Sequence, residues 1–234
     1  MDERDLLKMI LTPILERAKE DRMQSEDDRE DVVHVSKLSR GCVKFKENRL
    51  FEDDVDTFIE SLLKGENNSI SWLLGQLVHA SIEGLTDHKV IDGCQLIAEK
   101  EVFKKVRISC PPHEVTVVGH VDLYASCPQG DFAVELKYRG GGELGLRSLY
   151  QTKVYSAALG VPVYIIIITP EKVKVEKVEA DEAFLQDIVD RFKCKGLIEE
   201  IVFNPDARPC NNCALREQCD VWKRTVSVLL SKIS

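Results

Sequence analysis

The sequence lacks both a long hydrophobic run and a secretion signal. Its longest apolar stretch, VPVYIIII at 161–168, is far shorter than the ~20 residues that a membrane-spanning helix needs. The first residues, MDERDLLKMI, begin with acidic side chains and do not follow the pattern of a signal peptide. We therefore expect a cytoplasmic protein with no membrane partner. In that compartment, eight cysteines are more typical of metal ligands or buried thiols than of disulfides.

An excess of positive charge is also missing. The net charge of −8 excludes a surface coated with positive charge for nonspecific DNA binding. A local basic groove stays open, because lysines and arginines gather at 37–49 and again at 137–153. Much of the negative charge lies in KEDRMQSEDDRED at 19–31, which predicts a solvated loop.

Internal repeats and long low-complexity linkers are absent too. With 31% charged and 44% hydrophobic residues, the 234-residue chain has the composition of a soluble globular protein and the length for one good core. Its hydrophobic pattern predicts a mixed α/β core with accessory ends. The expected helices are 4–20 with a possible break at Pro13, 55–65, 69–85 capped by Ser69 or Ser71, 146–160 and 181–201; the expected strands are 96–108, 114–125, 131–138, 161–169 and 172–180, and 32–42 reads as irregular.

The segment AVELKYRGGGELG at 133–145 carries two patterns. Gly140-x-Gly142-x-x-Gly145 has the spacing of a dinucleotide-binding loop that follows a strand. The strand before such a loop is normally apolar on both faces, whereas Glu135 and Lys137 interrupt this one. A P-loop is excluded because Leu146 and Arg147 follow the glycines in place of Lys-Ser/Thr. A flexible loop is the simpler interpretation of the glycines.

The charged residues of the same strand suggest a catalytic site. Glu135 and Lys137 are two apart and therefore project to the same face of a strand. A hairpin around 126–130 would bring Asp122 of the preceding strand close to them. Two carboxylates with a backbone carbonyl suit Mg²⁺ or Mn²⁺, and a neighbouring lysine can orient water and offset charge on a phosphate. A surface salt bridge between Glu135 and Lys137 is the alternative.

The order of these motifs resembles the PD-(D/E)xK nuclease superfamily. Asp122, a hairpin, Glu135-x-Lys137 and a helix follow one another, and GHVD at 119–122 resembles the G-x-x-D form of RecB-like nucleases. Gln151 and Tyr155 are similar to the Q-x-x-x-Y helix motif of that branch, and His79 matches its helix histidine. The resemblance covers roughly 69–178; Val121 stands where the superfamily name expects proline.

The C-terminal cysteines suggest a second site. Cys210-x₂-Cys213-x₅-Cys219 supplies three thiolates, one short of a tetrahedral metal site or a cubane cluster. Zinc is the generic interpretation, but no second local pair of cysteines follows. The arrangement resembles RecB-like nucleases with an iron–sulfur cluster, in which one cysteine precedes the core. That resemblance implies a [4Fe–4S] cluster on Cys42 and the three tail cysteines, and leaves four cysteines as small buried hydrophobic residues, namely Cys94, Cys110, Cys127 and Cys194.

Together these motifs resemble the CRISPR-associated RecB-like iron–sulfur exonuclease family. The resemblance implies a restriction-endonuclease-like core at 69–180, N-terminal helices at 1–68 and an iron–sulfur module at 181–234. It implies metal-dependent cleavage of single-stranded DNA or DNA ends for spacer acquisition, with the CRISPR integrase subunits as partners. The alternative is an iron–sulfur docking subunit with little or no nuclease activity.

The resemblance also implies a role for each site residue. Asp122, Glu135 and His79 would hold Mn²⁺ or Mg²⁺, and Lys137 would position the attacking water. Gln151 and Tyr155 would hold the DNA backbone or the lysine. Three further basic residues are candidate phosphate contacts, with a solvated face as the alternative: Arg139, Arg147 and Lys153.

Overall fold

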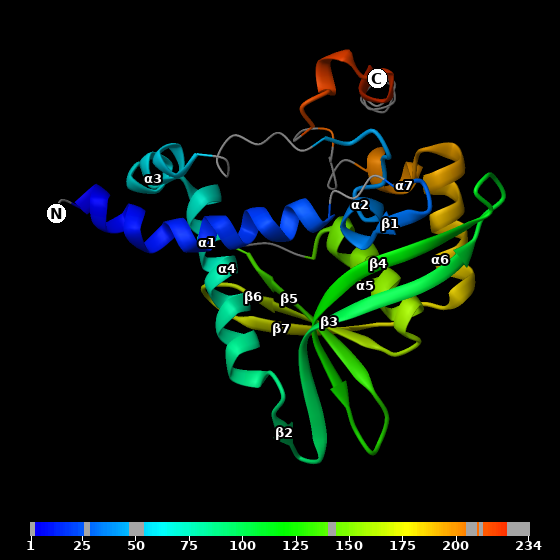
Figure 1. The fold of residues 1–234 in the computed structure, drawn as a ribbon, viewed down its shortest axis with the longest axis horizontal. Helices are drawn as coiled ribbons and strands as arrows, with labels where there is room; N and C mark the ends of the chain where they lie inside the picture. The colour runs from blue at the N-terminus through cyan, green and yellow to red at the C-terminus, as the bar shows by residue number, and fades with distance from the viewer. Residues whose placement is uncertain are drawn as a thin grey trace.

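The computed structural model describes residues 3–25, 29–46, 54–139, 144–204, 210 and 213–223. A seven-stranded mixed sheet is flanked by helices (Figure 1). The strands are β1 (Val32–His34), β2 (Val90–Ile91), β3 (Cys94–Arg107), β4 (Glu114–Ser126), β5 (Phe132–Tyr138), β6 (Val163–Ile168) and β7 (Val173–Val178). The helices are α1 (Glu3–Ser25), α2 (Val35–Leu38), α3 (Val55–Leu63), α4 (Asn67–Thr86), α5 (Leu146–Leu159), α6 (Glu182–Asp190), the π-helix η1 (Arg191–Lys195), α7 (Glu199–Val202) and the 3₁₀ helix η3 (Arg216–Gln218).

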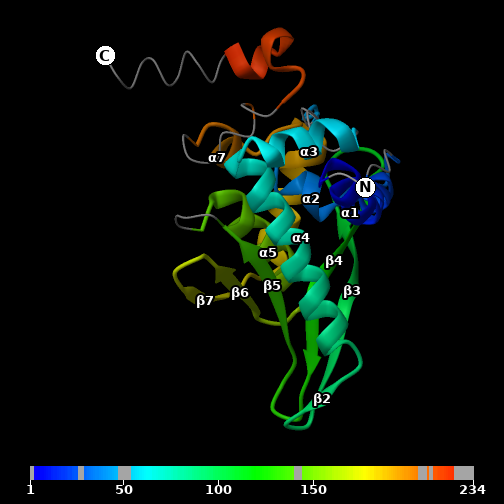
Figure 2. The ribbon, with the colours of Figure 1, turned by 90° about the vertical axis from the view of Figure 1, so that its left-hand side faces the viewer.

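The sheet has the strand order β2-β3-β4-β5-β6-β7, with β1 paired to β4 outside this path. β5 and β6 are parallel, as the connecting helix α5 requires, and β1 is parallel to β4. The other pairs are antiparallel. β3 and β4 form a long hairpin toward one edge of the sheet (Figures 1 and 2).

One edge of β4 serves two partners in succession. β3 occupies one edge of β4 along most of its length. β1 and β5 therefore both pair with the opposite edge of β4. β1 takes residues 116–118 and β5 takes residues 123–125. The residues between them, 119–122, lie where the sheet forks, and these include Asp122.

Two apolar cores hold the helices in place. The main core joins α5 and α6 to the sheet through buried side chains such as Val117, Val154 and Ile188. A smaller core joins α1, α3 and α4 around Phe58 and Leu11. α4 packs along β3, β4 and β5, whereas α5 packs on β3, β6 and β7. No helix among the described residues has both the length and the apolar character needed to cross a membrane.

The predicted strands and most predicted helices are confirmed within a few residues. Gly160, with φ of +70°, ends α5 as expected. The helix expected at 69–85 begins earlier, at Asn67, after the extended residue Glu66, whose side chain makes no capping hydrogen bond. Ser69 lies inside the helix and accepts a hydrogen bond from the buried Ser61 hydroxyl. α1 runs through Pro13 without a break.

Three local predictions are wrong. The loop expected at 19–31 is helical as far as Ser25, and the irregular stretch at 32–42 contains β1 and α2. β1 is too short to show a pattern of its own and is stabilised by pairing with β4. The helix expected at 181–201 continues from α6 into η1 but is interrupted before α7, because Gly196 adopts φ of +73°. Residues 140–143 of the glycine segment lie outside the described residues.

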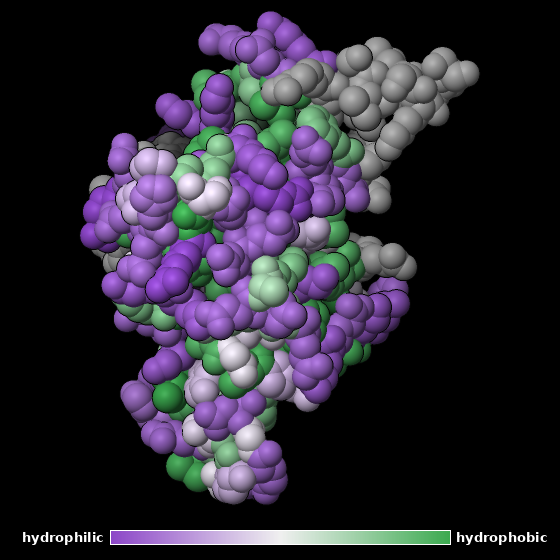
Figure 3. Space-filling model, turned by 90° about the vertical axis from the view of Figure 1, so that its right-hand side faces the viewer, coloured by the Kyte–Doolittle hydropathy of each residue, from purple (hydrophilic) through white to green (hydrophobic). Residues whose placement is uncertain are grey.

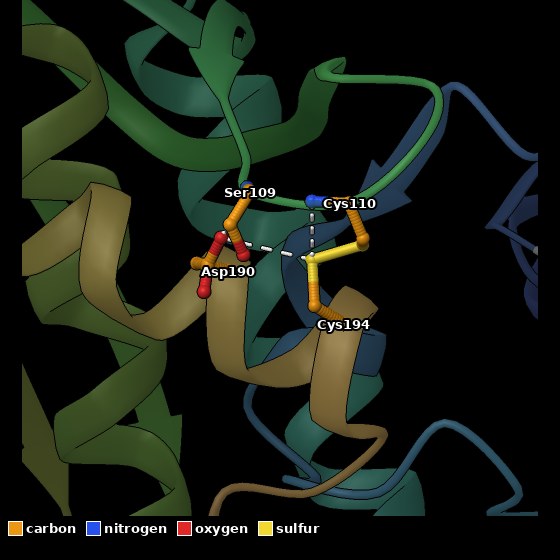
Figure 4. The surroundings of a disulfide bond; sticks show 4 residues. All are labelled: Ser109, Cys110, Asp190 and Cys194. Atoms are coloured by element: carbon orange, nitrogen blue, oxygen red, sulfur yellow. Dashed lines mark hydrogen bonds between the residues drawn. A yellow bond between two sulfur atoms is a disulfide. The ribbon is translucent and has the colours of Figure 1, made fainter.

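The prediction for four of the cysteines is also wrong. Cys94 forms a disulfide with Cys127, and Cys110 forms one with Cys194. The β3–β4 register explains the first pair, because it ends at Gln95–Ser126 and sets the next residues, Cys94 and Cys127, opposite each other. The second pair joins the β3–β4 turn to η1 (Figure 4). Neither pairing follows from spacing along the chain, since both depend on tertiary contacts.

The surface is mainly hydrophilic on the right-hand side of Figure 1, with scattered hydrophobic areas (Figure 3). The helix α6 and the turn between β3 and β4 lie on this side (Figure 1). The second disulfide therefore belongs to a predominantly polar part of the molecule.

Candidate functional site

Three acidic residues form a row across the fork of the sheet. β5 pairs with β4 as far as Leu123 and Val134. One residue further, the same register sets Glu135 opposite Asp122, at the point where the strands separate. On the other edge of β4, Glu99 lies between the pairs Ala98–Leu123 and Lys100–Val121, and its charge is close enough to Asp122 for the two to interact. Neighbouring strands thus bring acidic residues distant in sequence to one place.

Asp122 joins the fork to α4. One carboxylate oxygen, Oδ2, accepts a 2.5 Å hydrogen bond from the Leu136 backbone N–H. Leu136 lies beyond the last β4–β5 pair, Leu123–Val134. The other oxygen, Oδ1, lies 3.3 Å from Nδ1 of His79 on α4. Burial alone would lower the pKa of His79, but the hydrogen bond and charge of Asp122 outweigh burial and raise it. The predicted approach of His79 to Asp122 is therefore seen in the structure.

Glu135 and Lys137 form a buried ion pair. Lys137 Nζ lies 2.5 Å from Glu135 Oε1, and Glu135 is only 1% exposed. Burial, and then the charge of Asp122, raise the pKa of Glu135 to about 7. Burial opposes the charge on Lys137, yet Glu135 and Asp122 raise its pKa overall. The salt bridge considered from the sequence is therefore present, but it is not a surface pair, because Glu135 is buried and Lys137 is only partly exposed.

The second carboxylate oxygen of Glu135 has no hydrogen-bond partner among the described residues. This oxygen, Oε2, is buried. A buried carboxylate oxygen without a partner costs free energy, because it has lost water and gained nothing in return. This atom is therefore the clearest indication of a ligand that the site would hold.

α5 closes the site from another side. Tyr155 is buried, and burial together with the charge of Glu135 raises its pKa well above the usual value. Gln151 Nε2 lies 3.5 Å from Tyr155 Oη, so the two share one side of the helix as their spacing predicts. Gly119 permits this approach: a Cβ there would lie 3.2 Å from the Tyr155 ring and 3.1 Å from Val35.

Two glutamates at the site were missed from the sequence. Glu83 follows His79 by one turn of α4, and Glu99 has a positive φ of +48°, uncommon for a residue with a side chain. Burial, and then its hydrogen bond to Glu83, raise the pKa of Glu99 to about 8. Arg17 of α1 binds Glu83 at 2.9 Å. The i, i+4 spacing from His79 could have indicated Glu83, but Glu99 required the strand register.

The three basic candidates for phosphate contact have different neighbours in the structure. Arg139 donates to Ser148 at 2.9 Å beside the first turn of α5. The positive charge of Arg147 lies close enough to Lys137 to oppose the rise in the pKa of Lys137. Lys153, in contrast, lies over the rings of Tyr150 and Phe184, toward α6. All three thus stay candidates, with Arg139 beside the first turn of α5 and Lys153 on the side of α5 that faces α6.

The donor types at the fork suit a hard divalent cation, although their present arrangement does not form a closed site. Within the described residues, no group of three or more His, Cys, Asp or Glu side chains is placed to hold a metal ion. Lys137 and the Leu136 N–H instead satisfy oxygens that a cation would take. Carboxylate oxygens and the spare Glu135 Oε2 nevertheless match the preference of Mg²⁺ and Mn²⁺.

The four cysteines of the predicted cluster remain free thiols and gather at one end of the molecule. Cys42 and Cys210 belong to one apolar cluster with Val202. Burial raises the pKa of Cys210 to about 11, and the charges of Cys42, Cys213 and Cys219 add to the effect. The backbone also joins the two segments, since Ala214 N donates to Lys46 O at 2.8 Å. Chain ends far apart in sequence therefore meet at these thiols.

Comparisons with known proteins show the fold. No protein-family profile matches the chain, and no curated protein matches it. The Holliday junction resolvase Hjc of Archaeoglobus fulgidus is 21% identical over 33% of this chain and 64% of its own, with a TM-score of 0.21, too low to support an argument. The solved structure of SSO0001 is 15% identical over 91% of this chain and 96% of its own, with a TM-score of 0.61. The chain therefore shares the overall mixed α/β fold of SSO0001.

Proposed function

We propose that the protein is a metal-dependent deoxyribonuclease with a PD-(D/E)xK-type site. The observation that carries the proposal is the buried pair Glu135–Lys137 beside Asp122 and His79 at the fork of the sheet. A structural ion pair would not require a further carboxylate alongside it, nor a carboxylate oxygen with no partner. Like charges held this close are typical of sites that bind a cation.

Each residue has a distinct chemical task in this proposal. Asp122 and Glu135 would hold Mn²⁺ or Mg²⁺, with His79 as a further ligand, and the cation would lower the pKa of a water and polarise the phosphate. Lys137, whose pKa is raised, stays protonated and can offset the charge that develops on the phosphate. It would leave Glu135 Oε1 for this purpose when a cation neutralises the carboxylate.

Tyr155 and Gln151 would act as positioning residues. Tyr155 packs close to Gly119, and burial, which raises its pKa further, favours the protonated hydroxyl. It can therefore donate a hydrogen bond to a phosphate or to a neighbouring carboxylate. Arg139, beside the first turn of α5, would contact a phosphate adjacent to the reacting one.

The finer proposal follows the resemblance to CRISPR-associated RecB-like exonucleases. It assigns single-stranded DNA or DNA ends as the substrate, spacer acquisition as the process and the integrase subunits as partners. It also places a [4Fe–4S] cluster on Cys42, Cys210, Cys213 and Cys219. Support comes from the free state of these four thiols and their mutual electrostatic influence.

A docking subunit with little activity of its own is the second candidate. It is favoured by the partners of two carboxylate oxygens, since Lys137 binds Glu135 Oε1 and the Leu136 N–H binds Asp122 Oδ2. Such a protein would bind DNA ends but would not cleave them.

Cleavage of end-labelled single-stranded DNA separates the two candidates. The protein is purified without oxygen, and the products are resolved with Mn²⁺, with Mg²⁺ and with a chelator. We expect shortened products with either cation and none with the chelator. Binding without cleavage under all three conditions would support the docking subunit and contradict the nuclease.

A further inference from the structure

The disulfide Cys110–Cys194 joins two parts of the molecule that are 84 residues apart in sequence. Cys110 lies in the turn between β3 and β4, and Cys194 lies in η1 (Figure 4). The Cys110 N–H lies 3.2 Å from Cys194 Sγ, and the Ser109 N–H donates to Asp190 Oδ1 at 2.5 Å. The turn is therefore attached to the α6–η1 helix by one covalent bond and by separate hydrogen bonds.

The residues that follow Cys194 bind the segment that contains Cys42. Gly196 O accepts a hydrogen bond from Val43 N at 3.1 Å, and Ile198 N donates to Gly41 O at 2.7 Å. Between them, Leu197 forms an isolated β-bridge with Cys42. Only Lys195 separates Cys194 from the first of these bonds, so the position of Cys194 bears directly on that of Cys42.

This junction is closely packed and tolerates little displacement. A Cβ on Gly41 would lie 2.7 Å from Ile201 Cβ, and one on Gly196 would lie 3.2 Å from Val43 Cγ1. Both glycines also have positive φ, near +70°. Packing of this kind transmits a shift of η1 to residues 41–43, because no free space absorbs it.

We propose that Cys110–Cys194 is a redox-controlled clamp on the Cys42 segment. In the oxidised state the disulfide fixes η1 and thereby the hydrogen bonds of Val43 and Ile198. In the reduced state the covalent link is lost, but Ser109 still binds Asp190, and the Cys194 thiol can donate to Asp190 Oδ1, which lies 3.6 Å away. Reduction therefore loosens the junction without separating the two parts.

The clamp would close by exchange with a small disulfide such as oxidised glutathione. The thiolate of one cysteine attacks that disulfide and releases one glutathione thiolate. The second cysteine then attacks the mixed disulfide and releases the other. Two electrons pass from the cysteines to the small disulfide, and the two thiol protons end on the two glutathione molecules. Cys110 and Cys194 are both partly exposed, so a small reagent can reach them.

Hydrogen exchange of the full chain tests the clamp at two defined amides. The wild type is compared in its oxidised and dithiothreitol-reduced forms, with metal content measured before and after treatment. On reduction we expect Val43 and Ile198 to exchange about tenfold faster, because local opening becomes easier. Equal rates at both amides in the two forms would overturn the proposal, as would failure of oxidised glutathione to form the bond.

The chain supplies its own control in the other disulfide, Cys94–Cys127, at the opposite end of the β3–β4 ribbon. A Cys94→Ser/Cys127→Ser variant should keep the full redox response of Val43 and Ile198. A Cys110→Ser/Cys194→Ser variant should exchange like the reduced wild type under either condition. A redox response that persists in the second variant would show that another cysteine is responsible, and would reject the clamp.

Discussion

At the residue scale, the buried carboxylate of Glu135 is the strongest sign of function. An apolar side chain at this position would avoid the cost of removing charge from water, and the ion pair with Lys137 recovers only part of that cost. We interpret this local loss of stability as the consequence of a site prepared for a cation.

Glu99 allows a test of the electrostatics without touching the proposed metal ligands. Its pKa of about 8 lies above the usual value of 4.5, so the folded protein holds a proton that the unfolded chain releases between those values. Stability contributed by this proton is fully present below about pH 4.5 and is lost as pH rises to about 8. We expect Glu99→Gln, which stays neutral, to remove this loss.

The measurement is thermal unfolding of metal-free protein across that pH range. The unfolding midpoint of Glu99→Gln should rise relative to wild type with increasing pH, with little difference at the acid end. Glu101→Gln, two residues along the same strand and opposite His120 of β4, serves as the control and should show no such trend. A difference between Glu99→Gln and wild type that does not vary with pH would contradict the proposed coupling to Glu83.

At the element scale, the fork of the sheet places the site. β4 leaves β1 and joins β5 around residues 119–122, and α5 approaches the same stretch. Gly119 makes the approach possible because it adds no side chain between Val35 and Tyr155. A side chain there should displace Tyr155 and strain the core.

We therefore expect Gly119→Ala to destabilise the protein by roughly 1–3 kcal/mol, the usual cost of overpacking a core. Gly84→Ala is the matched control, because nothing lies within 4 Å of a Cβ at that position in α4. Alanine favours helix over glycine, so the control should gain ~0.5–1 kcal/mol. Chemical denaturation measures both changes, and a neutral Gly119→Ala would show that α5 does not press on the fork.

The sequence predicts elements with strong patterns and misses those formed by tertiary contacts. The helix of Gln151 and Tyr155 and the hairpin that joins Asp122 to Glu135 follow from periodicity and turn residues. β1 does not, because its three residues are ordered by β4. Glu99 joins the site only through the β3–β4 register, which the sequence leaves open. Both disulfides were missed for the same reason.

At the scale of the whole molecule, the cysteine end depends on contacts between distant parts of the chain. Cys42 packs with Cys210 and Val202, and partly buried side chains such as Trp222 add to this small cluster. Among the described residues this cluster is small, so its apolar contacts give limited stability against the entropy of ordering the segment. A bound cluster would supply the missing free energy, because binding and folding are coupled at such sites.

We expect protein purified without oxygen to be brown, with iron, sulfide and broad absorption near ~400 nm from a Cys₄-ligated cluster.

Cys213→Ala should lower the iron content and the thermal unfolding midpoint. Early protease cuts in this variant should map to the tail and near residue 42. Cys94→Ser/Cys127→Ser, which alters no proposed ligand, should keep its iron. Colourless wild type with stoichiometric zinc, or first cuts within 114–138, would reject the assignment.

The central claim is that Glu135 and Lys137 serve DNA cleavage, and a comparison of two lysines tests it most directly. Lys137→Ala removes the proposed catalytic group, and Lys105→Ala removes an exposed lysine that pairs with Glu114 at 3.0 Å. Both are assayed on end-labelled single-stranded DNA with Mn²⁺, after circular dichroism confirms the fold. We predict that Lys137→Ala loses at least ~100-fold in rate, the usual effect of removing such a group, while Lys105→Ala keeps wild-type activity. Equal cleavage by the wild type and Lys137→Ala would contradict the claim.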